Sequence, residues 1–425
     1  MDRISIKTQE RREGYTALQI GKPASGRPGY VTPGFARPAS ARGLARDVAR
    51  FSDLAGRAAD RAEASVKSSL SSLASDAMTR VSRGANKLYD DLHASAVGRA
   101  AFVVLENTMG ALFNFQDRHL DPDVAPPPAG LARDPLGKPL PAPAHPLPRL
   151  ATRGNQIVDA SSGKPVRLRG VDMSGFEYNK NGDQQDPQTF ARLAKMGVNI
   201  VRMPINQDWA LSDATYRQHL DRAISEANAK GIYVVLDLHW HDGKQLPCLD
   251  SDSLRMWRQL ANRYSKQPGV LYDIQNEPQW ISWKSYEPWA QAAIANIRAV
   301  NPNSLCIVEG TEYASNLSGV LSDPVKAPDV VYSVHEYGPS LRVPEAGPEF
   351  WDKTFGNVAS RYPVYVGEFG GNDADVAYGK QLIQYMDHKG LSWTSWNWGE
   401  AVPNLEKGGR LTAFGQLVAA HLKTP

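Results

Sequence analysis

Short apolar runs and amphipathic segments alternate along the chain from residue 166 onward. The apolar runs are rich in Val, Ile, Leu and aromatic residues, as in strands of a parallel sheet that is covered on both faces. The segments between them repeat apolar residues every three or four positions, which is typical of helices packed on a core. The predicted strands are 166–175, 198–205, 233–240, 270–278, 305–311, 330–337, 364–370 and 392–399. The predicted helices are 188–196, 215–230, 253–265, 286–300, 348–360 and 376–389, with weaker ones near Leu317 and after Phe414.

This alternation, carried through eight strands within residues 151–425, has the rhythm of a (β/α)8 barrel. A doubly wound open sheet shares the alternation, but no glycine-rich phosphate loop follows the first strand. We therefore expect an α/β fold of the TIM-barrel class, preceded by a region of another kind.

A different hydrophobic pattern occupies residues 43–120. Apolar residues at alternating steps of four and three begin with Leu44, Val48 and Phe51 and continue to Leu92, which is the seam of a coiled coil. A stripe this narrow and rich in alanine cannot be buried by one helix alone, so we expect an α-helical assembly region. Two arrangements remain open: an oligomeric stalk, and a helical hairpin folded on itself. The most apolar stretch, 101–116, is expected to end the helix against its neighbours or to form an assembly contact.

Composition separates this helical region from its surroundings. Residues 1–42 are rich in Gly, Pro, Arg and Ser and are expected to form a flexible arm. Residues 121–150 hold ten of the thirty prolines, which predicts a semi-rigid linker. The predicted domains are thus an arm (1–42), a helical region (43–120), a proline-rich linker (121–150) and a barrel (151–425).

Charge and hydropathy limit the classes of function. The formal net charge is +3, and the basic residues are interspersed with acidic ones. The sequence therefore does not indicate the concentrated basic face that nucleic-acid-binding proteins carry. No stretch approaches the ~20 apolar residues of a transmembrane helix, and the first residues lack the apolar core of a secretory signal. We expect no membrane partner, and a location in the cytoplasm, on a virion or outside the cell by a non-classical route. Cys248 and Cys306 are too few for a disulfide framework.

Polar residues gather at the carboxyl ends of the predicted strands, which converge on one mouth of a parallel barrel. In strand order they are Arg202; Asp237, His239, Trp240 and His241; Asn276 and Glu277; His335, Glu336 and Tyr337; Glu368; and Trp396, Asn397 and Trp398. A buried carboxylate costs free energy unless it is paired, so Glu277 and Glu368 indicate acid and base chemistry. Hydrolysis of a glycosidic bond needs such a pair, because one group protonates the leaving oxygen and the other attacks the sugar or activates water.

Six motifs in this order resemble glycoside hydrolase family 5, the cellulase family, over residues 151–425. They are Val201-Arg202-Met203-Pro204, Asp237-Leu238-His239, Asn276-Glu277-Pro278, His335-Glu336-Tyr337, Gly367-Glu368-Phe369-Gly370 and Ser395-Trp396-Asn397-Trp398. The resemblance implies a retaining mechanism with Glu277 as general acid/base and Glu368 as nucleophile. It also implies that Arg202 and Tyr337 hold Glu368, and that Asn276 binds the 2-hydroxyl of the cleaved sugar.

The same resemblance places His239 and His335 in that subsite and makes Trp396 the platform under the sugar ring. Other aromatic residues near the mouth suit further subsites, because pyranose faces pack on indole rings. These candidates are Trp209, Trp240, Trp280, Trp283 and Trp398. His239 and His241 are possible metal ligands, but we expect only one of them to point into the mouth, and we expect no metal and no cofactor.

Together these patterns predict a retaining, endo-acting β-glycoside hydrolase, either a cellulase-like endoglucanase or an exopolysaccharide depolymerase. The alternative is a glycan-binding structural or adhesin-like assembly protein, for example a phage tail component, whose barrel does not turn over its ligand. Two intact glutamates favour the enzyme, since a binding protein has no need of both. The expected partners are a polysaccharide or oligosaccharide substrate and, through the N-terminal helix, further copies of the chain in a homo-oligomer or larger assembly.

Overall fold

The computed structural model describes residues 6–10, 16–20, 127–128, 130–241, 244–245, 248–279, 281–339 and 347–423. The chain divides into two units, residues 1–112 and 113–425. In the first unit the described part is an antiparallel hairpin of β1 (Ile6–Glu10) and β2 (Thr16–Ile20). This hairpin falls within the predicted arm, and the predicted helical region 43–120 lies outside the described residues.

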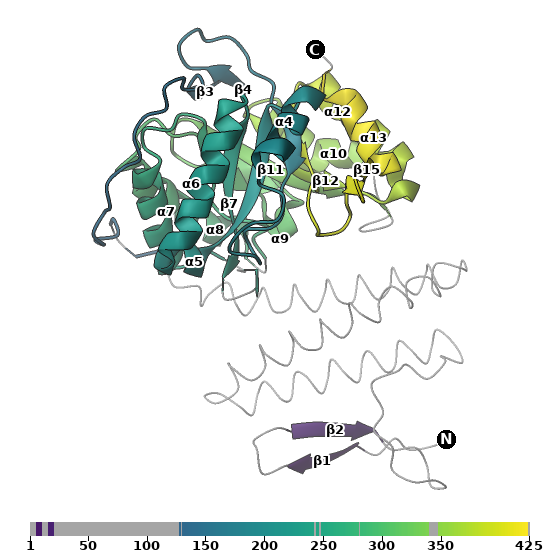
Figure 1. The fold of residues 1–425 in the computed structure, drawn as a ribbon. Helices are drawn as coiled ribbons and strands as arrows, with labels where there is room; N and C mark the ends of the chain where they lie inside the picture. Colours follow the sequence, from purple (N-terminus) through teal and green to yellow (C-terminus); the bar gives the residue numbers. More distant parts are fainter. Residues whose placement is uncertain are drawn as a thin grey trace, which may run out of the picture. The chain divides into compact units, whose positions relative to one another are not determined.

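Eight parallel strands close into a barrel in the second unit, as the alternating pattern predicts (Figure 1). Each strand pairs with the next in chain order, and pairing of the first with the last closes the ring. The strands are β5 (Arg169–Asp172), β6 (Ile200–Asn206), β7 (Tyr233–His241), β9 (Val270–Asp273), β10 (Cys306–Glu309), β11 (Val330–Tyr337), β12 (Val364–Gly370) and β13 (Ser392–Ser395). All eight predicted strands are therefore confirmed, several of them with shorter bounds.

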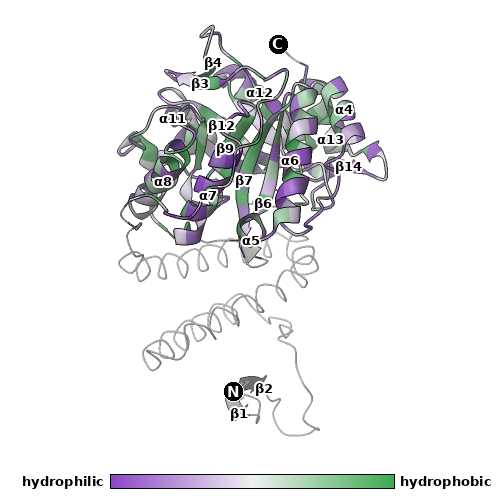
Figure 2. Cartoon of the chain, turned by 60° about the vertical axis from the view of Figure 1, so that its left-hand side comes forward, coloured by the Kyte–Doolittle hydropathy of each residue, from purple (hydrophilic) through white to green (hydrophobic). Residues whose placement is uncertain are grey.

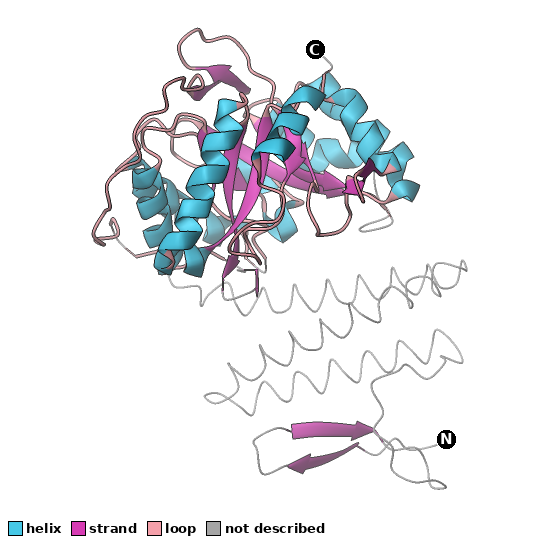
Figure 3. Ribbon diagram, in the orientation of Figure 1, coloured by secondary structure: helices cyan, strands magenta, loops and turns pink. Residues whose placement is uncertain are grey.

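Helices cover the outside of the barrel (Figure 3). They are α4 (Pro187–Met196), α5 (Gln207–Ser212), α6 (Ala214–Ala229), α7 (Ser251–Arg263), α8 (Trp283–Arg298), α9 (Thr311–Ala314), α10 (Pro348–Trp351), α11 (Asn357–Ala359), α12 (Val376–Lys389) and α13 (Ala413–His421). Polar residues lie on their outer faces and apolar residues on the strands, as the hydropathy colouring shows (Figure 2). Short turns and hairpins complete the unit: β8 (Lys244–Gln245), η1 (Ser318–Leu321), η2 (Asp352–Gly356), η3 (Asp373–Asp375), β14 (Glu406–Lys407) and β15 (Arg410–Leu411).

Helix α4 shows how local sequence sets these boundaries. Asp186 caps its first turn by accepting hydrogen bonds from the backbone N–H groups of Gln188 and Thr189, and Pro187 fills the first helical position. Gly197 ends the helix in the left-handed conformation, with φ of 105°, which glycine adopts without steric cost.

The amino end of the barrel is closed by a hairpin that the sequence pattern did not predict. It consists of β3 (Leu150–Arg153) and β4 (Gln156–Asp159), seen at the top of Figure 1. Leu150 and Ile157 of this hairpin pack against the first inward-facing residues of the barrel strands. We call this apolar cluster the floor; it contains Leu150, Ile157, Leu168, Ile200, Tyr233, Val235, Leu271, Leu305, Ile307, Val331 and Tyr365.

Residues 131–149, within the predicted linker, lie against the barrel rather than apart from it. The backbone N–H of Leu140 donates to the carbonyl of Arg263 at the end of α7. The side chains of Asn262 and Gln267 donate to the carbonyls of Gly137 and Pro141. We call residues 131–149 the strap, because hydrogen bonds hold it along the helices of the barrel.

None of the described helices is both long and apolar enough to cross a membrane.

Candidate active site

Arg202 is the third residue of β6 and lies inside the barrel, two residues beyond the floor residue Ile200. It does not lie at the end of the strand, where it was predicted. Its side chain has no exposed area. The guanidinium contacts five carboxyl groups and one amide: Asp172 (3.2 Å), Asp237 (3.1 Å), Asp273 (2.9 Å), Glu309 (2.8 Å), Glu368 (2.6 Å) and Asn276 Oδ1 (2.9 Å). One fixed cation therefore organises carboxyl groups from five other strands.

So many buried acids around one arginine do not all carry a charge. Burial raises the pKa of Asp172 well above its ordinary value, although Arg202 acts in the opposite direction. Burial likewise raises the pKa of Asp273, and the neighbouring charge of Glu309 adds to this increase. Both shifts favour the protonated form of these two groups.

The pKa of Glu309, in the same group, shifts in the opposite direction. Burial by itself would raise its pKa, but the charge and hydrogen bond of His335, together with Arg202, lower it to about 2. His335 Nε2 lies 3.1 Å from Glu309 Oε1. In return, the charges of Glu309 and Glu368 outweigh burial and raise the pKa of His335 well above the ordinary value for histidine.

Glu277 follows β9 in a loop and has a left-handed backbone conformation, with φ of 44°. Its backbone N–H donates to Glu309 Oε2 at 2.6 Å. Its side chain is 17% exposed, and Oε1 lies 3.1 Å from His335 Nδ1. The carboxyl group therefore reaches solvent while its backbone is held from inside the barrel.

Glu368 lies on β12 at a β-bulge that places it opposite His335. The preceding residue must be small, because a Cβ at Gly367 would collide with Ser333 Oγ. Glu368 Oε1 accepts from Arg202 at 2.6 Å, and Oε2 accepts from the Tyr337 hydroxyl at 2.5 Å. Burial, followed by the charge of Glu368, raises the pKa of Tyr337, so this hydroxyl keeps its proton and remains a donor.

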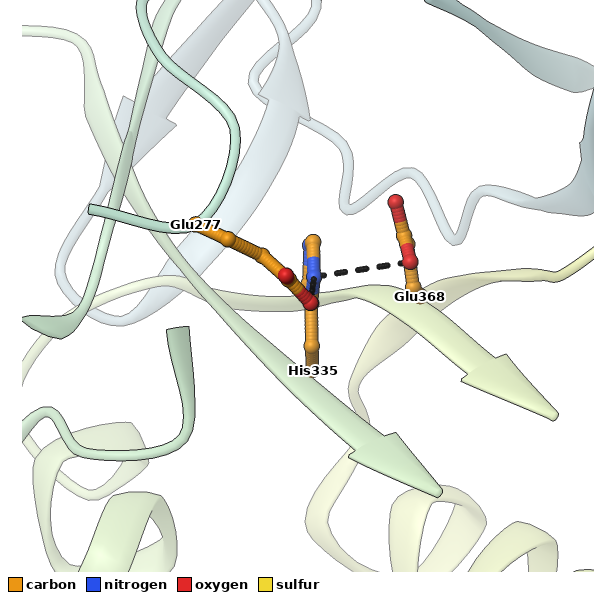
Figure 4. Close-up of side chains that lie close together, drawn as sticks. All are labelled: Glu277, His335 and Glu368. Carbon is orange, nitrogen blue, oxygen red and sulfur yellow. Dashed lines mark hydrogen bonds and ion pairs between the residues drawn. The ribbon is translucent and has the colours of Figure 1, made fainter. Parts of the chain in front are cut away.

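His335 lies between the two glutamates, as Figure 4 shows. One carboxylate oxygen of Glu277, one of Glu368 and a ring nitrogen of His335 all lie within 4.8 Å of one another. Two carboxyl groups about 5 Å apart are the arrangement found in retaining glycosidases, since inverting enzymes leave room for a water molecule.

His239 and Trp396 form a flat surface beside this pair. Their rings stack with centroids 5.7 Å apart and an angle of 15° between the planes. His239 Nδ1 donates to Asp237 Oδ2 at 2.6 Å. Burial would lower the pKa of His239, but the charge and hydrogen bond of Asp237 raise it to about 9.

A β-bulge at the end of β7 separates His239 from His241. Residues two apart on a regular strand face the same side, so alternation alone does not separate them. Beyond the bulge His241 contacts Gln207 and Asp208 instead of the stacked pair.

The remaining aromatic candidates fall into three groups. Trp209 and Trp240 are partly exposed; Trp209 packs on Tyr216 and Trp240 lies 6.1 Å from the ring of Tyr178. Trp398 is only 2% exposed, and Trp283 is 9% exposed and packs against Tyr286 and Tyr332; that these two line subsites stays a prediction. Trp280 lies outside the described residues.

Two clusters of acidic and imidazole groups have the spacing of metal ligands: Glu277, His335 and Glu368, and Asp237, Asp273 and Glu309. Arg202 already contacts Asp237, Asp273, Glu309 and Glu368. A guanidinium and a metal ion would compete for the same oxygens, so a site without metal remains our prediction.

Four buried carboxyl groups of this region are not among the residues expected from the sequence: Asp172, Asp273, Glu309 and Glu177. Asp172, Asp273 and Glu309 each occupy the last position of a strand, and the strands that end in Asp273 and Glu309 are otherwise apolar, which is a signal that the sequence does carry. Glu177 follows β5 and accepts a hydrogen bond from the backbone N–H of Gly175. Burial raises its pKa to about 7.

The family model for Cellulase (glycosyl hydrolase family 5) matches residues 159–402. The chain is 30% identical over 317 residues to the endoglucanase of Paenibacillus polymyxa, covering 58% of this chain and 78% of that relative. It is 30% identical over 312 residues to the major extracellular endoglucanase of Xanthomonas campestris pv. campestris, covering 57% of this chain but only 64% of that relative. A crystal structure of a β-glucanase from Saccharophagus degradans in complex with cellotetraose has a TM-score of 0.59 and 25% identity, covering 67% of this chain and 97% of that one.

Proposed function

Because this chain belongs to glycosyl hydrolase family 5, the cellulase family, we propose that it is a retaining, endo-acting β-glucanase that uses Glu277 as acid/base and Glu368 as nucleophile. The observation that carries this assignment is the approach of the two carboxyl groups within 4.8 Å. The endoglucanase names of its relatives and the cellotetraose complex of the related β-glucanase support a β-glucan substrate.

In the first step Glu277 donates a proton to the leaving oxygen while Glu368 attacks the anomeric carbon. The glycosidic bond breaks, and the sugar becomes joined to Glu368 through an ester. In the second step Glu277 takes a proton from water, whose oxygen attacks the anomeric carbon and releases Glu368. The second inversion of configuration restores the original anomer.

The contacts of each glutamate support this division of roles. Glu368 is 4% exposed and is held by Arg202 and Tyr337, which fix one of its oxygens each for attack. Glu277 is more exposed and contacts solvent, so it can exchange its proton during each turnover. Asn276 is adjacent to Glu277, and its Oδ1 accepts a hydrogen bond from Arg202, which supports a role in binding the 2-hydroxyl of the sugar. The stacked rings of His239 and Trp396 support a role as the platform under that sugar.

Assembly through the N-terminal region is a further part of this proposal. It is supported by the heptad spacing between Leu44 and Leu92. The measurement that tests it is the mass of the full chain in solution.

The chemistry is tested with two variants and two substrates. Glu368→Gln should lower the rate on β-glucan by more than about 10⁴-fold, because the nucleophile is lost. Glu277→Gln should lower it by about 10²–10⁴-fold, as expected for a general acid, but should still form the glycosyl ester from an aryl cellobioside whose leaving group needs no proton. Glu368→Gln should fail on both substrates.

The control is Glu287→Gln, which neutralises a buried glutamate on the outer helix α8. Proton NMR of the first product from cellotetraose should show the β-anomer before mutarotation. Release of reducing ends by Glu368→Gln at the wild-type rate would overturn the nucleophile, and initial release of the α-anomer would overturn retention. Binding of glycan without turnover by the wild-type chain would support the adhesin-like alternative.

A further inference from the structure

Glu309, the last residue of β10, contacts three parts of the active site at once. It is fully buried. Its Oε2 accepts from the backbone N–H of Glu277 at 2.6 Å, while Oε1 lies 2.8 Å from Arg202 Nη2 and 3.1 Å from His335 Nε2. Its carboxylate thus links the loop of the proposed acid/base, the central arginine and the histidine between the two glutamates.

Only a carboxylate satisfies this set of partners. Arg202 and the Glu277 backbone donate hydrogen bonds to the two oxygens of Glu309, and His335 Nε2 lies 3.1 Å from Oε1, at ion-pair distance. An amide has one oxygen, so glutamine at this position would turn its NH₂ group toward either the Glu277 backbone or the pair formed by Arg202 and His335. A donor would then face a donor inside the barrel, and at least one buried N–H group would lose its acceptor.

The geometry also favours one protonation state of His335. Its Nε2 faces the Glu309 carboxylate, and its Nδ1 faces Glu277 at 3.1 Å and Glu368 at 3.6 Å. The negative charges of Glu309 on one side of the ring and Glu368 on the other favour the doubly protonated imidazolium over the neutral ring. Without Glu309 the ring would lose its nearest carboxylate on the Nε2 side.

We propose that Glu309 is a positioning residue of the reaction, which anchors the backbone of Glu277 and holds His335 as a cation between Glu277 and Glu368. This rests on the proposed function of those two glutamates. Holding the Glu277 loop fixes the direction from which the proton reaches the leaving oxygen. Holding His335 doubly protonated keeps a positive charge within hydrogen-bond distance of Glu277 and near Glu368 through both steps.

The other charged or titratable groups that face Glu309 come from every neighbouring element. They are Arg202 on β6, Asp237 on β7, Asp273 on β9, Glu277 in the loop after β9, Tyr286 on α8, His335 on β11 and Glu368 on β12. Arg202 keeps four other carboxyl contacts when Glu309 is neutralised, whereas His335 Nε2 has no other contact of this kind among the described residues. The effect of removing the charge should therefore be concentrated on His335.

Two substitutions separate position from charge. Glu309→Gln should lower kcat on β-glucan by about 10²-fold, as expected for displaced catalytic groups, with little change in KM. Glu309→Asp keeps the charge but is one methylene shorter, so it should lower kcat by a smaller factor while His335 stays charged. Glu287→Gln, which neutralises a buried glutamate on the outer helix α8, is the control and should leave kcat unchanged.

The direct measurement is the ¹⁵N spectrum of the histidine rings of the full chain, with the His335 signals assigned by comparison with His335→Gln. At pH 8 the wild type and Glu309→Asp should show both His335 nitrogens protonated, and Glu309→Gln should show a neutral ring. The pH profile of kcat should change shape in Glu309→Gln alone. A merely structural role would lower the melting temperature without changing the ring or the profile.

The proposal is overturned if Glu309→Gln keeps the wild-type kcat, or if it loses activity while His335 remains doubly protonated and the pH profile is unchanged. If Glu309→Gln does not fold, the spectrum and kcat of Glu309→Asp decide: a neutral His335 or a wild-type kcat in that variant overturns it. Failure of the proposed function would give a different result, namely full activity of the Glu368→Gln variant.

Discussion

The two ends of the barrel are made by the same eight strands and have opposite interiors. At the amino end the floor is apolar, with Ile200, Leu271 and Ile307 packed beneath the β3–β4 hairpin. Two residues later on the same three strands stand Arg202, Asp273 and Glu309, all fully buried and joined by ion pairs. Because inward-facing side chains recur at every second residue of a strand, a shift of two residues along each strand leads from the floor to the active site.

The two ends of the barrel therefore have different roles: the apolar floor stabilises the fold, and the opposite end carries the candidate catalytic groups. Burial of apolar side chains at the floor contributes to folding directly. Burial of ionised groups costs free energy that their contacts only partly offset. An enzyme can hold such groups because the rest of the barrel supplies the stability, so changes at the two ends should have different consequences for folding and for activity.

Among the changes that test this comparison, replacing Arg202 with methionine should have the largest effect on stability and activity together. Five carboxyl groups would lose the cation that they share, and breaking a buried ion pair in this way costs about 3–5 kcal/mol. Glu368 would also lose its 2.6 Å donor, so activity should disappear even in the folded fraction. Urea unfolding and the rate on β-glucan, measured at the same temperature, test both parts.

The matched change at the floor is Leu271→Ala. It should cost a similar free energy of unfolding, about 2–5 kcal/mol, because it leaves a cavity. The folded protein should nevertheless retain kcat, since Leu271 packs within the floor, at the end of the barrel opposite the proposed catalytic groups. Equal losses of kcat in the two variants would contradict the separation between the ends.

The sequence pattern predicts the strands and the outer helices of the barrel better than the interior of the candidate active site. Apolar runs locate all eight strands, and the positions near their carboxyl ends single out Glu277 and Glu368 as candidates. The predicted position of Arg202 along its strand was wrong. A charged residue after an apolar run suggests that the strand ends there, whereas Arg202 lies in the interior of β6. The bulges at His239 and Glu368 depend on pairing between strands that are distant in sequence.

The strap was harder to predict for a related reason. Prolines between residues 121 and 150 indicate an extended chain, but the pattern does not show what that chain contacts. The contacts are formed by backbone carbonyls, such as that of Pro148, which accepts from the Tyr233 hydroxyl at 2.8 Å. Any residue carries a carbonyl, so these contacts leave no mark in the sequence.

Removal of the strap should have a smaller effect, confined to stability. A chain beginning at residue 150 should unfold about 2–4 kcal/mol more easily than one beginning at residue 113, because several hydrogen bonds of about 1 kcal/mol each are lost. Leu140, which packs against the core, would be lost as well. Urea unfolding of the two chains measures the difference, and kcat below the transition should be equal. Equal stability of the two chains would show that the strap acts only as a linker, as the sequence predicts.

The last comparison distinguishes the two ends by the pH dependence of the free energy of unfolding. The pKa of His239 is about 9 in the folded protein and about 6.5 when unfolded. A raised folded pKa stabilises fully below the unfolded value, and this contribution is lost as the pH rises through 9, on the order of 3 kcal/mol. From pH 6 to pH 9.5 the wild type should therefore lose more stability in urea unfolding than His239→Gln does. Tyr233→Phe at the floor is the control: burial raises the pKa of Tyr233 to about 12, above this range, so the stability difference between Tyr233→Phe and the wild type should be the same at both pH values. A His239→Gln variant whose stability changes with pH as much as that of the wild type would show that the Asp237 pair does not set the charge of His239.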